Sequence, residues 1–433
     1  MAAERIARSR AAARVSAHTH RTAMEQVATS VAPAAEAPTL LDTLARAPAA
    51  AALVVAGLDI LDRRALQLVH SQLRDAVGEA TTVLQAYYRR GAPRLSPPTP
   101  RRWPRLEALR MSPDLEVLQG LGAETWATLR TLQLLGNGDV DVPFVRALAA
   151  ALRRMPALRS LALHSVRFAD EATGALFWAS SAAAAPELRS LSFIHAGLTS
   201  ALATALAATG WRLEELVLSH NRDLGAAGVA ALVAAPTFSL RRLDLSYCGL
   251  DAASLLRVAN VAWPLEELGL DSNTFRGAEA EAAAAVAALS RHARLRTLSF
   301  ADCGLCAAAF KALVEASWPA LTFLDASSSS AKCDGPHALG PAAFAGFPKL
   351  EGLVLDWVPL GAAGALTLAS RRWPFLSELW MGTAGLGDAG LAALARGAWP
   401  ALVRLDVRRN GFSAALNWDA IYRSAPALVD LTG

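Results

Sequence analysis

Lysine, cysteine and aromatic residues are all scarce in this chain of 433 residues. Lysine supplies only three of the 42 basic residues, so the net charge of +4 reflects an arginine-rich composition and by itself indicates no nucleic-acid partner. Four cysteines are too few for a disulfide framework, so we expect a reducing intracellular compartment and a cytoplasmic protein. Aromatic residues make up 6% of a chain that is 53% apolar, so a large core must be built from small and medium side chains.

Long apolar runs are also missing. The longest early run, residues 49–58, stops at Asp59 and is far shorter than the roughly 20 residues of a membrane-spanning helix. The first thirty residues lack the apolar centre of a secretory signal. They are rich in arginine and nearly free of acid, which resembles an organelle transit peptide. A disordered tail over residues 1–38 is the interpretation we adopt.

One motif, Leu-x-x-Leu-x-(Leu/Phe/Val/Met), dominates what the sequence does contain. It begins at residues 106, 129, 158, 188, 213, 240, 265, 295, 321, 350, 376, 402 and 428. The mean spacing is about 27 residues, and self-similarity at such a period is the signature of a solenoid.

The spacing within the motif predicts a strand. Leu243 and Leu245 are two residues apart, so in an extended chain both point to one face, while Asp244 and Ser246 point to the other. Stacking such strands side by side makes a parallel sheet with a leucine-lined inner layer.

The unit at residues 240–250, LRRLDLSYCGL, resembles the leucine-rich repeat family at every position of that family's pattern. The resemblance covers residues 106–433 in 12–13 repeats. It implies a right-handed α/β solenoid of the ribonuclease-inhibitor-like class, a horseshoe with a parallel sheet on the concave face and helices on the convex face. In this family the ninth position, here Asn221, Asn273 and Asn410 among others, hydrogen-bonds backbone groups of neighbouring turns.

Helices are expected after the turns. Residues 224–232, 360–368 and 386–394 share a Leu-Gly start, a second glycine and a final leucine at helical spacing. Trp-Pro precedes several strands, as at 318–319 and 399–400, and proline cannot continue a helix. We therefore interpret Trp-Pro as the end of an outer helix and its tryptophans as structural.

Ahead of the repeats, residues 39–86 are expected to form a small N-terminal helical segment that caps the solenoid. Residues 58–77 also resemble the second half of an F-box, through the apolar set Leu66, Leu68, Val69, Leu73 and Val77. The family's Leu-Pro opening is absent, and Leu73 stands where many members carry tryptophan. The resemblance implies docking onto the adaptor subunit of a cullin-type ubiquitin ligase, and it is compatible with a cap.

Residues 87–105 are rich in proline and arginine and are interpreted as a solvated linker. Because this segment also contains Tyr87, Tyr88 and Trp103, RNA or an acidic surface is an alternative partner for it.

No motif indicates catalysis. Cys303 and Cys306 form a Cys-x-x-Cys pair, but no second pair lies at zinc spacing. His164, His195 and His220 follow three successive strands, yet no carboxylate or thiolate completes a metal site. No phosphate-binding glycine loop or nucleophile elbow is present. We predict a non-catalytic protein without a metal or cofactor.

Charges on the strands fall into two groups. At the second repeat position they alternate in sign, which predicts a self-neutralising ladder of Arg189, Glu214, Arg241, Glu266 and Arg296. The predicted protein-binding residues of the concave face are Asp244, Tyr247, Asp271, Asp302, Asp325, Asp356, Trp357 and Trp380. An acidic surface with aromatic residues suits a basic protein segment. An ordinary solvated strand face is the alternative.

The predicted function is a protein–protein interaction module with its ligand on the concave face. Its most specific form is a substrate receptor of a cullin-type ubiquitin ligase, similar to F-box proteins with leucine-rich repeats. A scaffold on the cytoskeleton or the ciliary axoneme is the alternative from another class, and an RNA-associated protein that uses residues 87–105 is a third.

Overall fold

The computed structural model describes residues 83–86, 104–112, 115–121, 125–275, 279–328, 339–413 and 418–433. The chain divides into two compact units, Met1–Ala80 and Thr81–Gly433, and every described residue belongs to the second. The expected tail, the five F-box-like apolar residues and residues 87–103 of the expected linker lie outside the described residues.

A single parallel sheet organises the second unit. In the described residues it has fourteen strands, which follow one another in sequence order, and the predicted α/β solenoid is confirmed. The strands are β1 Val83–Ala86, β2 Ala108–Met111, β3 Thr131–Val140, β4 Ser160–Phe168, β5 Ser190–Ile194, β6 Glu215–Val217, β7 Arg242–Asp244, β8 Glu267–Gly269, β9 Thr297–Ser299, β10 Phe323–Asp325, β11 Gly352–Val354, β12 Glu378–Trp380, β13 Arg404–Asp406 and β14 Asp430–Thr432. Each of the thirteen predicted units supplies one strand, from β2 to β14.

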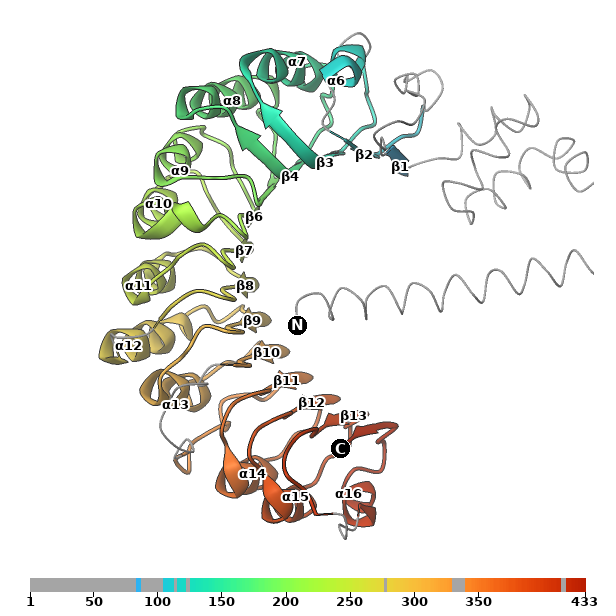
Figure 1. Ribbon diagram of the computed structural model, residues 1–433, viewed down its shortest axis with the longest axis vertical. Helices are drawn as coiled ribbons and strands as arrows, with labels where there is room; N and C mark the ends of the chain where they lie inside the picture. The colour runs from blue at the N-terminus through green and yellow to red at the C-terminus, as the bar shows by residue number, and fades with distance from the viewer. Residues whose placement is uncertain are drawn as a thin grey trace, which may run out of the picture. The chain divides into compact units, whose positions relative to one another are not determined.

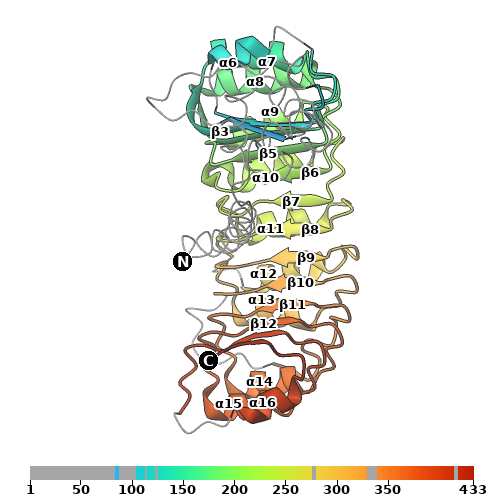
Figure 2. The ribbon, with the colours of Figure 1, turned by 90° about the vertical axis from the view of Figure 1, so that its right-hand side faces the viewer.

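The helices lie on the other side of the repeats. They are α6 Leu115–Leu121, α7 Val142–Leu152, α8 Glu171–Ala184, α9 Ser200–Ala207, α10 Gly225–Val233, α11 Ala252–Asn260, α12 Glu279–Leu289, α13 Ala307–Glu315, α14 Gly361–Ala369, α15 Gly387–Leu394 and α16 Asp419–Ser424, with a short 3₁₀ turn, η1, at Arg222–Leu224. The repeats form a curved stack, with the strands lining its inner side and the helices its outer side (Figure 1). Seen from the concave side, the strands lie one above another like rungs (Figure 2). None of the described helices is both long and apolar enough to span a bilayer.

The repeated leucines form the core between strands and helices. Leu216, Leu243 and Leu268 stand opposite one another on three neighbouring strands, and all are buried. Each buried leucine contributes about 1.5–3 kcal/mol relative to an exposed one. The leucine spacing therefore fixes both the register of the sheet and the position of the core.

Buried asparagine side chains satisfy the backbone where each strand turns toward its helix. The side-chain oxygen of Asn273 accepts the amide protons of Cys248 and Leu250 at 3.1 and 3.0 Å. Its side-chain nitrogen donates to the carbonyls of Leu245 and Leu270 at 2.9 and 2.7 Å. Asn221 and Asn410 make equivalent contacts, which confirms the expected role of the ninth position.

Tryptophan and glycine shape the outer helices. The indole nitrogens of Trp318, Trp373 and Trp399 donate to the carbonyl five residues earlier at 2.9–3.0 Å, so each closes the C-terminus of the helix before it. All three rings are buried, and the structural interpretation of these tryptophans is confirmed. At Gly228, an added Cβ would lie 2.6 Å from a methyl carbon of Leu224, so the second glycine of the helix motif makes room for the leucine that opens it.

The structure corrects one boundary. Residues 83–86 form strand β1, so the expectation of helix through residue 86 is wrong there. β1 pairs in register with β2, so the expected linker at residues 87–105 lies in sequence between two paired strands of one sheet. Helix was expected at residues 83–86 because a short strand within a longer apolar stretch cannot be told from helix by periodicity alone. Between β10 and β11, the described residues 339–349 form turns in place of an outer helix.

The asparagine contacts predict a large loss of stability for Asn273→Ala. The substitution leaves the buried amides of Cys248 and Leu250 and the carbonyl of Leu245 without partners, and each such group costs about 1–3 kcal/mol. The carbonyl of Leu270 keeps the Cys303 thiol as a donor. The free energy of unfolding, measured by urea denaturation, should fall by at least about 2 kcal/mol. The neighbouring exposed Thr274→Ala is the control and should change it by less than about 0.5 kcal/mol. Equal effects of the two substitutions would contradict the structural role of Asn273.

Candidate functional site

The predicted binding residues occupy two different levels of the repeat. Asp244, Asp325 and Trp380 end their strands, and Asp271 and Asp356 lie two residues past the ends of β8 and β11. Tyr247, Asp302 and Trp357 lie at the eighth repeat position, past the strand ends, with φ angles of 60°, 57° and 63°. The concave face therefore holds five of the eight residues, and the other three form part of its rim.

The strand-end aspartates bind backbone of their own repeat. Asp244 and Asp325 each accept, at 2.9 Å, the amide proton of the residue two positions later. Asp406, at the end of β13, does the same for Arg408 at 3.1 Å. Asp406 was not predicted, although its fifth repeat position, shared with Asp244 and Asp325, is a signal that identifies it.

Asp271 and Asp356 bind backbone of the next repeat. Asp271 accepts the amide proton of Ala301 at 2.9 Å and a short hydrogen bond from the Ser299 hydroxyl. Asp356 accepts the amide proton of Gly382 at 2.7 Å. These carboxylates connect successive repeats, so they contribute to the stack as well as to its surface charge.

Together these five aspartates form an acidic row along the concave face, defined by Asp244, Asp271, Asp325, Asp356 and Asp406. Burial raises the pKa of Asp271, and the nearby charges of Asp325 and Asp244 raise it further. Burial likewise raises the pKa of Asp356, with added repulsion from Asp406 and Asp325. The carboxylates of the row therefore act on one another across several repeats.

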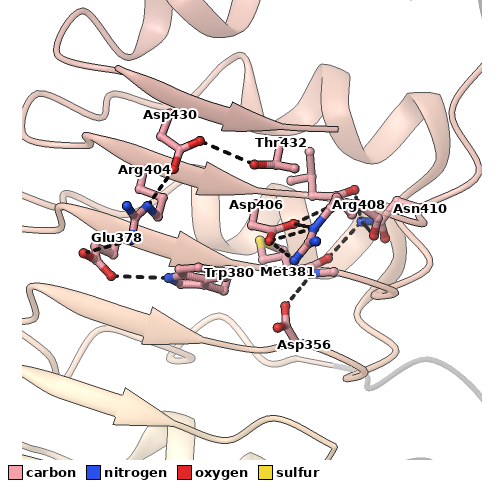
Figure 3. A network of polar contacts seen from close by, with 12 residues as sticks. Asp356, Glu378, Trp380, Met381, Arg404, Asp406, Arg408, Asn410, Asp430 and Thr432 are labelled. Atoms are coloured by element: carbon pink, nitrogen blue, oxygen red, sulfur yellow. Dashed lines mark hydrogen bonds and ion pairs between the residues drawn. The ribbon is translucent and has the colours of Figure 1, made fainter. Parts of the chain in front are cut away.

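The rest of this surface is made of small residues and one basic group. From β7 to β13, the fifth and seventh repeat positions carry five aspartates, one arginine, Val354 and Trp380, and otherwise only serine, glycine and alanine. Arg408 is the basic group, and its guanidinium pairs with Asp406 at 2.6 Å (Figure 3). At Gly269 an added Cβ would lie 3.0 Å from an oxygen of Asp244, so the small residues leave space for the carboxylates. We call this surface, formed by the fifth and seventh repeat positions from β7 to β13, the acidic floor. Few side chains project from it.

Trp380 is held in place at the C-terminal end of this floor. The guanidinium carbon of Arg404 lies 5.5 Å from the centre of its ring. Arg404 also pairs with Asp430 at 2.9 Å and with Glu378 at 3.8 Å (Figure 3). One face of the tryptophan is therefore covered by a cation that the protein itself supplies.

The rim residues project from left-handed turns. The amide nitrogens of Tyr247, Asp302 and Trp357 donate to carbonyls of the next repeat at 2.7–2.9 Å, which continues the sheet pairing past the strand ends. The Tyr247 and Trp357 side chains remain 49% and 38% exposed. Such exposed aromatic residues on a fixed backbone are suited to contact a partner.

The charged ladder lies beside the acidic row and is largely self-neutralising. Arg189 pairs with Glu214 at 3.9 Å and Arg241 with Glu266 at 3.5 Å, as predicted. A parallel pair, Arg242 with Glu267 at 3.3 Å, occupies the third position. Because each exposed pair contributes only about 0–1 kcal/mol, the ladder adds little to stability and leaves the excess charge to the acidic row.

The histidines and cysteines have structural contacts. His164 hydrogen-bonds the hydroxyl of Ser192 at 2.9 Å, while the rings of His195 and His220 lie 6.4 Å apart. Cys303 donates to the carbonyl of Leu270 at 3.0 Å, and burial raises the pKa of its thiol well above the ordinary value. Cys306 caps α13 by accepting the amide proton of Ala309 at 3.4 Å. Within the described residues, no three His, Cys, Asp or Glu side chains are placed to hold a metal ion.

One comparison with known protein families identifies the repeat. A family model described as a leucine-rich repeat matches residues 213–233, which include β6 and α10. No curated protein sequence matches the chain.

Among solved structures, the chain is similar to the complex of Rad7 and Elc1 in yeast, with 16% identity, coverage of 89% of this chain and 92% of that one, and a TM-score of 0.47. It is also similar to the TLR13–ssRNA13 complex, with 18% identity, coverage of 76% and 45%, and a TM-score of 0.46. The Toll–Spatzle complex from Drosophila gives 14% identity, coverage of 84% and 44%, and a TM-score of 0.41.

The raised pKa of Asp271 predicts a pH-dependent gain of stability for Asp271→Asn. Asparagine retains an oxygen for the Ala301 amide but carries no charge. A folded-state pKa above the unfolded value means that stability is lost as pH rises through it, because the ionised carboxylate is disfavoured in the fold. Urea denaturation should show the variant more stable than the unsubstituted protein at pH 7, with the difference shrinking toward pH 4.

Asp302→Asn is the matched control, because Asp302 is exposed at the rim and asparagine tolerates its left-handed φ. It should change the free energy of unfolding by less than about 0.5 kcal/mol at either pH. A loss of stability at pH 7 for Asp271→Asn would show that the charge of Asp271 is not disfavoured.

Proposed function

This chain is a leucine-rich-repeat protein, and we propose that its concave face is the receptor for a basic, extended segment of a protein partner. The repeat fold is typical of non-catalytic interaction modules, and it offers a long continuous surface. The acidic row carries the proposal, because five aspartates and one arginine occupy the central floor.

Two features of the floor favour an extended segment. The positions between the aspartates are mostly serine, glycine and alanine, so a partner backbone can approach the carboxylates closely. The aspartates already accept backbone amide protons, as Asp325 does from Ser327, so they are positioned before any ligand arrives. A surface organised in advance loses less conformational entropy on binding.

The proposal predicts that the triple variant Asp271→Asn, Asp325→Asn and Asp356→Asn loses affinity for a basic probe. Asparagine keeps the backbone contacts and removes three charges. Fluorescence anisotropy with labelled hexa-lysine at low salt should show binding at least about tenfold weaker, since each partly buried charge contributes on the order of 0.5–1 kcal/mol. The loss should shrink as salt is added.

The control variant makes the same change of charge on the outer helices, with Glu171→Gln, Glu279→Gln and Glu281→Gln. These residues are exposed and lie at or near helix starts. Their replacement should leave hexa-lysine affinity within about twofold of the original, because these glutamates lie on the outer helices, on the opposite side of the repeats from the acidic row. If the concave triple variant and the unsubstituted protein bind hexa-lysine with equal affinity, the acidic row is not the binding site.

A finer proposal concerns residues 58–77, which are similar to part of an F-box. If this segment recruits the adaptor of a cullin-type ubiquitin ligase, the repeats capture the ligase substrate. Support for this role comes from the apolar pattern of the segment alone.

Co-purification with a cullin adaptor tests this role. Leu66→Asp or Leu73→Asp should abolish it, because either change places a charge in the apolar set, whereas the control Gln67→Asp adds a charge at a neighbouring polar position and should retain it. The scaffold interpretation makes two different predictions. No adaptor co-purifies, and the chain sediments with microtubules or axonemes whether or not it carries Leu66→Asp.

A further inference from the structure

A groove of about 770 Å³ lies at the rim, past the ends of β6, β7, β8 and β9. Loops that follow four successive strands line it, and no strand residue does. The residues on which the argument depends are Arg222, Asp223, Tyr247, Asp251, Ser272 and Asp302. The groove is therefore distinct from the acidic row on the strand face.

Tyr247 presents an aromatic ring at one side of this groove. Its ring stacks on that of His220, with centroids 5.1 Å apart and planes inclined by 23°. Its amide nitrogen donates to the carbonyl of Asp271 at 2.7 Å, which fixes the backbone from which the ring projects. Because the side chain is still 49% exposed, the stacked ring keeps area available to a ligand.

Carboxylates dominate the charge of the groove. Three aspartates and one arginine line it, a balance of −3 + 1 = −2. Asp223 and Asp302 are exposed. Asp251 caps α11 by accepting the Ser254 amide proton at 2.8 Å, and the hydrogen bonds from Ser254 hold its pKa below the ordinary value. A cation that enters the groove thus meets an aromatic face and excess negative charge together.

We infer that this groove binds an arginine side chain of the protein partner, with the guanidinium stacked on Tyr247 and paired with Asp302. Arginine fits better than lysine because its guanidinium is planar, weakly hydrated and able to stack on an aromatic ring while it donates to a carboxylate. The inference deepens the proposed function, on which it rests, by adding a site that distinguishes arginine from lysine. Ser272 holds the same repeat position between Tyr247 and Asp302, and all three line the groove.

Hexa-arginine and hexa-lysine, each labelled with fluorescein, test the groove by anisotropy with the full-length chain. The unsubstituted protein should bind hexa-arginine several-fold more tightly than hexa-lysine. Tyr247→Asn should weaken hexa-arginine binding by about 3- to 10-fold, the size expected for one cation–π contact, and should change hexa-lysine binding by less than about twofold. Asparagine is chosen because it tolerates the left-handed φ of Tyr247.

Thr383→Asn is the matched control. Thr383 holds the same repeat position with φ of 58°, but it follows β12 and lies outside the groove lining. It should leave both affinities unchanged, and circular dichroism should show that both variants are folded. The groove assignment is overturned if the unsubstituted protein does not prefer hexa-arginine, if Tyr247→Asn keeps the preference, or if Thr383→Asn loses as much affinity.

The concave triple variant separates this inference from the proposed function. Weaker binding of both peptides with the arginine preference intact supports both assignments. If the triple variant binds both peptides normally while Tyr247→Asn abolishes the preference, the concave receptor fails and the groove remains.

Discussion

The turn after each strand is the constraint on which the whole stack depends. At that point the chain leaves the sheet inside the protein, so its amides and carbonyls need partners that the strand ladder no longer supplies. Asn221, Asn273 and Asn410 provide four of these contacts each, with groups of their own and the preceding repeat. Where cysteine replaces asparagine, as at Cys248 and Cys303, the thiol still donates to a carbonyl of the preceding repeat.

The need of the backbone amides at these turns for hydrogen-bond partners also accounts for the acidic row. Asp271 and Asp356 accept amide protons from the next repeat, so they are bound into the turn as well as displayed on the surface. Such an arrangement brings like charges close together, and the raised pKa of both carboxylates reflects it, after burial. The concave face therefore combines a structural role with a fixed negative charge, and a basic ligand would relieve part of the repulsion.

Left-handed turns separate the rim from the floor. Each eighth-position residue from Ser165 to Arg409 has a positive φ, between 52° and 63°. This geometry directs side chains such as His220 and Tyr247 away from the strand face, where they stack on each other. One repeat unit thus builds two surfaces of different chemistry, an acidic floor and a rim with aromatic and carboxylate groups.

The sequence alone determined the sheet, its leucine core, the asparagine turns and the ends of the outer helices, because each depends on spacing within one repeat. The strand at residues 83–86 could not be predicted from such spacing, since four residues carry too little periodic signal. Only the tertiary structure decided which aspartates meet backbone from the next repeat and which rings meet at the rim. Asp271 reaches Ala301 across 30 positions of sequence, and His220 reaches Tyr247 from the preceding repeat. Such contacts depend on the register and curvature of the stack, which arise only when repeats pack together.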